Sequence, residues 1–198
     1  MGGVLLFCIS EAAKPFVQQA LNARWADGDA RMFYLVESRT CPDNAEGFKE
    51  ELQDVEAFSS EFIGASVQEC QNWALQNWFQ VNFIEQDFIA IADARSAVDN
   101  TLVVQFYGRA LDPEDPVEFE GFGVLPHESD TWVEWRIEPR WACWVFSDLT
   151  HGALEMSYPV YLGLKEELTD ENGVFDAAEA QRLVCGSPKE LLRRRRLD

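Results

Sequence analysis

Two apolar runs of strand length follow each other closely, at residues 88–92 and 102–106, with a short polar link between them. Neither run alternates apolar with polar residues, so both faces of each strand are expected to be covered, as in a sheet flanked by helices. Asp93 directly follows the first run. This carboxylate is therefore predicted to lie at the carboxyl end of a buried strand, where open α/β sheets tend to bind ligands.

The rest of the chain continues this alternation of strands and helices. Further strands are expected at residues 4–9, 32–36 and 131–138. Ser10 and Ser66 are candidate helix N-caps, and Glu69, three residues after Ser66, completes a capping-box pattern. The order of elements predicts an α/β fold: a three-layer sandwich with a central mixed, partly parallel sheet flanked by helices.

One domain is expected over residues 1–186, followed by a basic C-terminal tail at 187–198 that ends as a frayed segment. An acidic and helical insertion is predicted at about 43–61, with its apolar residues in one stripe. An acidic loop rich in proline and glycine is predicted at 111–126. The apolar segment 141–149 fits either a strand or a helix, because periodicity alone does not separate the two.

Several short segments together resemble a small uncharacterised microbial α/β domain family. The matching segments are residues 4–7, 33–37, 88–96, 102–107, 136–139 and 172–175. The similarity spans most of the chain, although segments 43–58 and 141–156 depart from the family pattern. The resemblance implies the α/β fold, and it implies no activity because the family has no known one.

The net charge is −19 at pH 7. The tail is the exception, since residues 189–198 carry five basic and two acidic side chains. An acidic field repels phosphate backbones, which argues against binding of nucleic acid by the body of the chain. The same field attracts basic proteins and cations, although acidity can also serve solubility alone.

No run of about eighteen apolar residues is present, so no segment is expected to span a membrane. The first nine residues lack the basic region of a signal peptide. The five cysteines are scattered, without a CxxC pair or the Cys/His spacing of a zinc site. These features predict a cytoplasmic protein with no metal or cofactor, and with Cys8 and Cys143 as buried, reduced thiols.

A candidate ligand site surrounds Asp93. Arg95 and Ser96 follow it within three residues, and a carboxylate beside a guanidinium can orient a polar ligand. Glu37 ends another expected strand and would supply a second carboxylate for acid–base chemistry. The alternative is structural, because Asp93 and Ser96 can cap the turn after the strand, and an Asp–Arg pair can clamp it.

Two weaker patterns concern catalysis and metal binding. His151 could act as a base for Cys143 or Ser147, but no GxSxG, glycine-rich phosphate loop or HExxH motif accompanies it. Residues 168–179 match a calcium-binding loop except at the first position, where leucine replaces aspartate. The alternative for this segment is an Asx turn with Gly173 at positive φ.

The remaining candidate is a protein-binding surface. Trp132 is expected on one strand face with Glu134 and Arg136, and an exposed tryptophan beside charges is typical of binding hot spots. Burial of Trp132 under a helix or loop is the alternative. The acidic loop adds candidate contacts at Asp112, Glu114 and Asp115.

We therefore predict a non-enzymatic intracellular module whose acidic surface binds a basic protein or peptide. The abundance of tryptophan, the charge and the lack of a specific catalytic motif support this function. The alternative is a small-molecule enzyme or ligand-binding protein with its site at the strand ends, around Asp93 and Arg95. The sequence leaves open whether the chain is an enzyme.

Overall fold

The computed structural model of the chain describes residues 3–22, 31–53, 57–109 and 117–195. The chain forms two compact units. The first contains residues 1–105 and 138–140, and the second contains residues 106–137 and 141–198. The single domain expected over residues 1–186 remains a prediction, since compact units can belong to one domain or to two.

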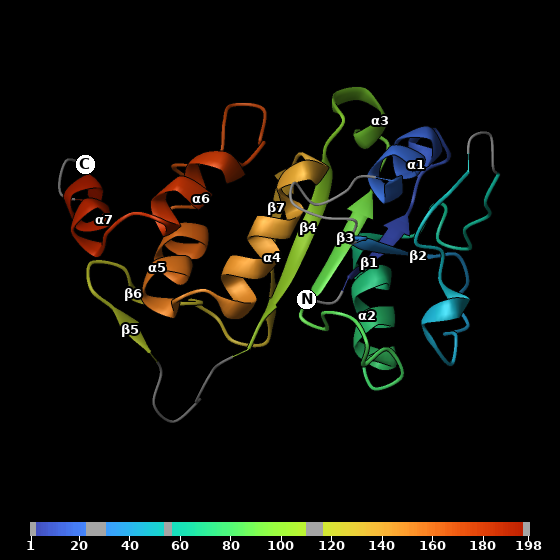
Figure 1. Cartoon of the computed structure of the whole chain (residues 1–198), viewed down its shortest axis with the longest axis horizontal. Coiled ribbons are helices and arrows are strands. Elements are labelled where there is room, and N and C mark those ends of the chain that lie inside the picture. Colours follow the sequence, from blue (N-terminus) through green and yellow to red (C-terminus); the bar gives the residue numbers. More distant parts are fainter. Residues whose placement is uncertain (1–2, 23–30, 54–56, 110–116, 196–198) are drawn as a thin grey trace. The chain divides into compact units, whose positions relative to one another are not determined.

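The five longest strands form one mixed sheet in the order β2-β1-β3-β4-β7 (Figure 1). Their bounds are Val4–Cys8 for β1, Phe33–Val36 for β2, Phe88–Ala92 for β3, Leu102–Gly108 for β4 and Thr131–Ile137 for β7. β1 is parallel to both β2 and β3. The predicted α/β class and the mixed, partly parallel sheet are confirmed, and the two apolar runs are neighbouring strands as expected.

Strands β1 and β3 are buried on both faces. Every residue of β1 and β3 is buried, and Leu6 of β1 lies in register with Leu35 on one side and Ala90 on the other. Polar side chains at these positions would face no water and no partner. This burial explains why the two strands are apolar throughout rather than at alternate positions.

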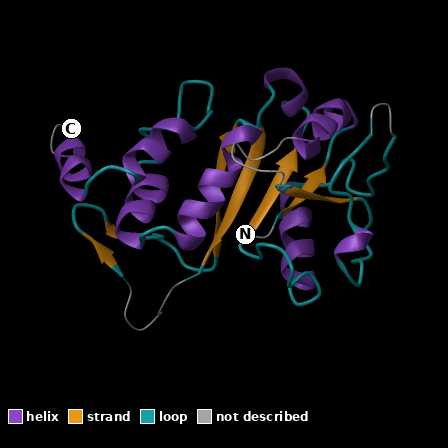
Figure 2. Cartoon of the chain, in the orientation of Figure 1, coloured by secondary structure: helices purple, strands orange, loops and turns teal. Residues whose placement is uncertain are grey.

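Helices accompany these strands in the described part of the first unit (Figure 2). The 3₁₀ turn η1, Glu11–Ala13, leads into α1, Lys14–Asn22, and a single-turn helix α3, Ser96–Asp99, follows β3. The apolar residues of α1 are buried, namely Phe16, Val17, Ala20 and Leu21. Ser10 occupies the N-cap position as predicted, but its side chain makes no capping hydrogen bond.

Helix α2, Val67–Asn77, begins with the predicted capping box. The Ser66 side chain accepts from the Glu69 N–H, and the Glu69 carboxylate accepts from the Ser66 N–H at 2.9 Å. Trp73 of α2 meets Phe7 of β1 edge to face, with ring centroids 5.7 Å apart, and Phe62 contacts both rings. These aromatic contacts hold α2 against the sheet of the first unit.

The helical insertion expected at 43–61 is wrong for the part that the structure describes. A single 3₁₀ turn, η2 at Ala45–Gly47, is followed by extended and irregular chain. The Lys49 carbonyl accepts a hydrogen bond from the Leu35 N–H at 2.8 Å, so this segment covers the outer edge of β2. Its apolar residues Phe48, Leu52 and Phe58 are nevertheless buried. Irregular chain can therefore bury apolar side chains whose spacing resembles that of a helix.

The part of the second unit that follows β7 is mainly helical. Its helices are α4 at Ala142–His151, α5 at Leu154–Tyr158, the π-helix η4 at Pro159–Gly163, α6 at Ala177–Val184 and α7 at Pro188–Arg195. The 3₁₀ turn η3, Pro139–Trp141, leads into α4. Segment 141–149, for which the sequence left strand and helix as alternatives, is therefore helical. Two-residue strands β5, Glu118–Phe119, and β6, Gly123–Val124, form a hairpin inside the segment predicted as a loop.

The alternation predicted for β7 is confirmed. Trp135 and Ile137 are buried, whereas Glu134 is exposed. The indole N–H of Trp135 donates to the Tyr161 carbonyl at 3.0 Å, and the Trp135 and Tyr161 rings both pack near Phe175. This aromatic cluster fixes η4 against one face of β7.

The C-terminal segment differs from the frayed end that was expected. Arg193, Arg194 and Arg195 lie in helix α7. The Arg194 Nη1 atom is 2.7 Å from the Glu179 carboxylate of α6. Arg194 therefore has an acidic partner within the second unit, and this pair stabilises the terminal helix.

Candidate functional site

The first unit places the predicted strand-end residues at one edge of the sheet. Glu37 follows β2 and Asp93 follows β3, and β1 lies between these two parallel strands. Neighbouring strands are about 4.8 Å apart, so the backbones of Glu37 and Asp93 are roughly 10 Å apart. The two carboxylates thus share an edge of the sheet without being on neighbouring strands.

Asp93 and Ser96 form a reciprocal cap. The Asp93 Oδ1 atom accepts from the N–H and the hydroxyl of Ser96 at 3.0 and 3.1 Å, and the Asp93 N–H donates to the Ser96 hydroxyl at 3.1 Å. Ser96 is fully buried. These hydrogen bonds are those expected if the two residues fix the turn between β3 and α3.

Arg95 pairs with Asp99, one helical turn later, with Nε 2.6 Å from Oδ2. The other oxygen of Asp99 accepts from the hydroxyl and the N–H of Thr101. Although burial acts to raise the pKa of Asp99, the hydrogen bonds from Thr101 and Arg95 outweigh it and lower that pKa. The described contacts of Arg95 thus stabilise α3.

Glu37 is engaged on the far side of β1. Its Oε1 atom accepts from the Ser59 N–H at 3.3 Å and lies 3.6 Å from the Lys49 ammonium. Ser59 and Lys49 both belong to the segment that was predicted as an acidic helix. The Glu37 carboxylate therefore helps to hold this segment beside the end of β2.

A further polar cluster near this edge has no local signature in the sequence. The Glu61 carboxylate accepts from the Arg39 N–H at 2.6 Å and from the Ser38 hydroxyl at 3.1 Å. The Arg39 guanidinium lies 3.2 Å from Glu69 and 5.0 Å from the Phe62 ring centroid. The hydrogen bond from the Arg39 N–H is the main cause of the lowered pKa of Glu61. Because these partners are more than twenty residues apart, only a fold can bring them together.

The second unit contains a cavity of about 470 Å³ beside the first residues of β7. We call it the β7 cavity. Its lining residues are Pro126, His127, Glu128, Thr131, Val133, Leu162, Gly163, Lys165, Glu166 and Glu167. Pro126, Val133 and Leu162 are half-buried and supply an apolar floor, whereas Glu128, Glu166 and Glu167 are exposed at its rim. The cavity thus combines half-buried apolar residues with three exposed carboxylates and the half-buried Lys165.

Local backbone geometry shapes this cavity. Asp130 has a positive φ of 55°, and its N–H donates to the Gly108 carbonyl at 2.7 Å, which turns segment 126–130 back beside β7. The Thr131 hydroxyl fixes this segment by donating to the Glu128 carbonyl at 3.0 Å. On the other side, η4 ends at Gly163, and the turn that follows carries Lys165 to Glu167.

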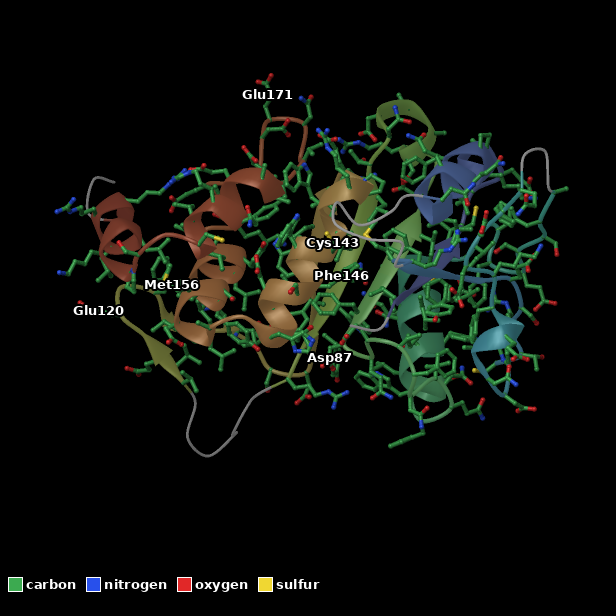
Figure 3. All side chains as sticks on the ribbon, in the orientation of Figure 1. Asp87, Glu120, Cys143, Phe146, Met156 and Glu171 are labelled. Atoms are coloured by element: carbon green, nitrogen blue, oxygen red, sulfur yellow. The ribbon has the colours of Figure 1, made fainter. Side chains whose placement is uncertain are left out.

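A smaller hollow of about 190 Å³ lies between the β5–β6 hairpin, α5 and α7. Buried Phe119, Pro159 and Leu191 line it together with exposed Glu118, Glu120 and Glu155. Figure 3 shows Glu120 extending from the hairpin. This hollow repeats the combination of apolar lining and acidic rim on a smaller scale.

Trp132 is only half-buried, and its ring packs against Tyr107 with centroids 5.1 Å apart. The Arg109 guanidinium lies 5.9 Å from the Tyr107 centroid. The indole N–H of Trp132 is buried and has no hydrogen-bond partner among the described residues. Trp132 is therefore held against β4 rather than presented as a free aromatic side chain.

The second unit also holds a buried polar pair. The Tyr161 hydroxyl donates to the Asp148 carboxylate at 2.8 Å. Burial raises the pKa of Asp148, and burial together with the nearby Asp148 charge raises the pKa of Tyr161. The pair links η4 to α4 and lines neither hollow.

The segment resembling a calcium loop is a hairpin. Thr169 pairs with Phe175, and Asp170 Oδ1 accepts from the N–H groups of Asn172 and Val174, with Gly173 at a φ of 73°. Figure 3 shows Glu171 at the tip of this hairpin, pointing away from α6. The Asx-turn alternative is thus confirmed.

The acidic residues Asp176 and Glu179, which follow the hairpin, form hydrogen bonds and ion pairs within the second unit. Asp176 caps α6 by accepting from the Glu179 N–H at 2.9 Å. Glu179 itself contacts Arg182 and Arg194, and the hydrogen bond from Arg182 is the main cause that lowers its pKa to about 2. Across the described ranges, no group of three or more His, Cys, Asp or Glu side chains is arranged to hold a metal ion.

The candidate dyads all lie on α4. Cys143 is buried and His151 is exposed at the end of the helix. The two are eight positions apart, or about 12 Å along the helix axis, which separates a thiol from its base. Ser147 is one turn from His151 and remains the closer partner. All five cysteines are free, and Cys8 and Cys143 are buried as predicted.

No family model, curated protein or solved structure matches the chain. The resemblance to a microbial α/β family therefore stays a prediction. The candidate contacts Asp112, Glu114 and Asp115 lie outside the described residues. Within the described part of the chain, no helix has both the length and the apolar character needed to cross a membrane.

Proposed function

We propose that the chain is a non-enzymatic recognition module that binds a basic segment of a partner protein through the β7 cavity. The observation that carries this function is the apolar floor of the cavity beneath three exposed glutamates. Lysine and arginine side chains have an apolar stem and a cationic head, so they match both parts of the cavity. Pockets of roughly 300–1,000 Å³ hold drug-sized ligands, so the cavity has room for such a side chain.

The charge of the whole chain supports the same function. A net charge of −19 raises the rate at which basic partners meet the surface and disfavours nucleic acid. The five free cysteines suit a reducing compartment, so we place the protein in the cytoplasm.

For the first unit, we propose the three-layer arrangement that the sequence predicts. In the first unit, β2 and β3 lie on opposite sides of β1. Right-handed crossovers through α1 and α2 then put the two helices on opposite faces of the sheet. Helices on both faces of the sheet would support the three-layer sandwich.

The competing function is a small-molecule site at the strand ends around Asp93 and Arg95. The hydrogen bonds of Asp93 with Ser96, and of Arg95 with Asp99, favour a structural role for these residues. The β7 cavity, by contrast, offers space next to charged groups. We therefore favour recognition of a basic segment.

The test uses an eight-residue peptide of alternating lysine and threonine with blocked ends, here termed the Lys–Thr peptide. Binding is measured by calorimetry at low and high salt, with a Glu–Thr peptide of the same length as the control ligand. We expect the Lys–Thr peptide alone to bind, and its affinity to fall as salt screens the charges.

A matched pair of variants separates the cavity from the overall charge. Glu166→Gln with Glu167→Gln removes two charges at the cavity, and Glu46→Gln with Glu171→Gln removes two exposed charges elsewhere. We expect the first pair to weaken binding about tenfold and the second by less than about twofold. Equal losses in the two variants would show that only the overall charge matters, and lack of binding to the parent protein would refute the proposed function.

A further inference from the structure

We infer that the partner segment binds as an added β-strand along the outer edge of β7 and places a lysine or arginine side chain in the β7 cavity. The inference rests on the proposed function and adds the conformation of the partner. It assigns an extended backbone with a basic residue at a position that faces the cavity.

The outer edge of β7 is identified by a single hydrogen bond. β7 is the last strand of the sheet, so one of its edges faces away from β4. The Arg136 carbonyl accepts from the Phe175 N–H at 2.8 Å, and Phe175 belongs to the hairpin at residues 169–175. The backbone groups of successive residues in a strand point to opposite edges, so those of every second residue point to the same edge. Those of Trp132 therefore point to the same outer edge as those of Arg136.

The start of β7 gives the same assignment. The Asp130 N–H donates to the Gly108 carbonyl of β4, and Asp130 has a positive φ of 55°. We assign a bulge to Asp130 and Thr131, in which both residues face Gly108, because it reconciles this hydrogen bond with the outward carbonyl of Arg136. The backbone groups of Thr131 and Val133 thus face β4, and those of Trp132 face outward.

The outer edge is covered at one end and open at the other. The hairpin covers it at Arg136. At Trp132, no described residue forms a hydrogen bond with the outward backbone groups. An uncovered strand edge is a template for pairing with another chain. The open end is also where Thr131 and Val133 line the cavity.

The pleat of the strand directs a partner side chain into the cavity. The cavity lies on the face of β7 that carries Thr131 and Val133. Directly opposite residues in paired strands place their side chains on the same face. A residue opposite Val133 therefore extends over the cavity, where Glu166 and Glu167 favour a cationic head group.

Charged residues on an edge strand also serve to prevent pairing. That role needs only charges along the edge. Here the charged residues line a hollow together with apolar residues. Charges alone are sufficient to repel a second strand, so the hollow has no role in preventing pairing. The arrangement suits the capture of one cationic side chain.

Two isomers of the Lys–Thr peptide test strand pairing while keeping every charge. One isomer is N-methylated at the lysines and the other at the threonines. The N–H groups of successive peptide residues point to opposite edges, so all lysine N–H groups share one edge and all threonine N–H groups share the other. Each isomer therefore blocks one edge of the peptide and leaves the other intact. We expect one isomer to bind at least about tenfold more weakly than the parent peptide, and the other to stay within about threefold.

Exchange of individual amide protons, followed by NMR, provides the readout on the protein. The Trp132 N–H points outward and should exchange more slowly when the peptide is bound. The Val133 N–H faces β4 and serves as the internal control, with no change expected.

Equal binding of both isomers and the parent peptide would overturn strand pairing and leave the proposed function standing. Loss of binding by both isomers would also overturn it, because strand pairing depends on one edge only. Failure of the unmethylated peptide to bind would instead refute the proposed function itself.

Discussion

At the end of β3, in the first unit, Asp93 accepts two hydrogen bonds from a fully buried serine. Beside β7, in the second unit, Glu166 is exposed at the mouth of a cavity of about 470 Å³. The sequence marks Asp93 as a candidate by its place after a strand, whereas it does not mark Glu166. Their surroundings give them different roles.

The difference is one of available hydrogen-bonding capacity. A carboxylate that already accepts from a backbone N–H and a hydroxyl would have to release them before it could bind a ligand. A carboxylate at the mouth of a cavity exchanges only water for a cation. Replacing Asp93 should therefore affect folding, whereas replacing Glu166 should affect binding.

The largest expected effect is on the stability of the first unit. Asp93→Ala should lower the free energy of unfolding by about 2–3 kcal/mol, because it leaves the buried Ser96 hydroxyl without its acceptor. Asp93→Asn keeps an oxygen acceptor and should lose less. Urea denaturation at pH 7 measures both variants, with Glu166→Gln as a control that should change by less than about 0.5 kcal/mol.

A different result would revive the strand-end site. If Asp93→Ala unfolds like the parent protein, the cap contributes little to stability. A small molecule that stabilises the parent protein but not Asp93→Asn would then assign Asp93 to ligand binding. In that case the contrast between the two regions would be reversed.

The next effect concerns the cavity. Val133→Arg should place a guanidinium from the chain itself over the acidic rim and fill the floor of the cavity. We expect the Lys–Thr peptide to bind at least about tenfold more weakly, a loss of about 1.4 kcal/mol or more. Val133→Leu keeps the apolar floor and is the matched control. Unchanged affinity in Val133→Arg would exclude the cavity as the binding site.

Much of the fold could be predicted because its signals are local. The apolar runs of β1, β3 and β4, the alternation in β7 and the capping box of Ser66 with Glu69 each lie within a few residues. The insertion at 43–61 was mispredicted because its apolar spacing suits a helix. Lys49 instead pairs with Leu35 at the edge of β2, which is a contact that depends on tertiary structure.

The candidate sites divide in the same way. The sequence placed Asp93, Arg95 and Ser96 correctly after a strand. Their contacts are local, because Asp93 pairs with Ser96, Arg95 with Asp99, and Asp99 in turn with Thr101. The β7 cavity was missed because its walls come from segments about thirty residues apart, at 126–133 and 162–167. Glu166 and Glu167 are adjacent in the sequence, but no local pattern there indicates Val133 and Leu162 as neighbours of these two carboxylates.

A smaller effect tests Asp148, a half-buried carboxylate of the second unit that lines neither hollow. Burial raises the pKa of Asp148 above its ordinary value of 3.8. The folded protein then binds the proton more tightly than the unfolded chain, so this contribution to stability is greatest below pH 3.8 and is lost as pH rises through the folded pKa. Asp148→Asn keeps an acceptor for Tyr161 without a buried charge.

We expect Asp148→Asn to raise the free energy of unfolding at pH 7 by up to about 1 kcal/mol, and to remove this part of the pH dependence. Asp148→Ala should lower the free energy of unfolding, because it leaves the buried Tyr161 hydroxyl without an acceptor. Denaturation curves between pH 3 and pH 8 measure both. A lower stability for Asp148→Asn than for Asp148→Ala would contradict the role assigned to the hydrogen bond.

The smallest effect concerns Glu179, a charged side chain of the second unit that is engaged in the manner of Asp93. Its hydrogen bond from Arg182, with further help from Arg194, lowers its pKa to about 2. The folded pKa lies below the ordinary value of 4.5, so the stabilisation is present above pH 4.5 and is lost as pH falls through 2. Arg194→Gln should cost about 0.5 kcal/mol at pH 7, since the pair is partly exposed.

The cost of Arg194→Gln should fall as pH drops through about 2 and disappear below it, where Glu179 is protonated in both proteins. Lys189→Gln removes one positive charge from the same helix without touching Glu179 in the described contacts, and it is the matched control. A pH-independent cost would mean that Arg194 acts through the packing of its aliphatic stem. Because Glu179 lies outside the β7 cavity, none of these changes should alter the affinity for the Lys–Thr peptide, and a change would show that the acidic field acts as a whole rather than through the rim of the cavity.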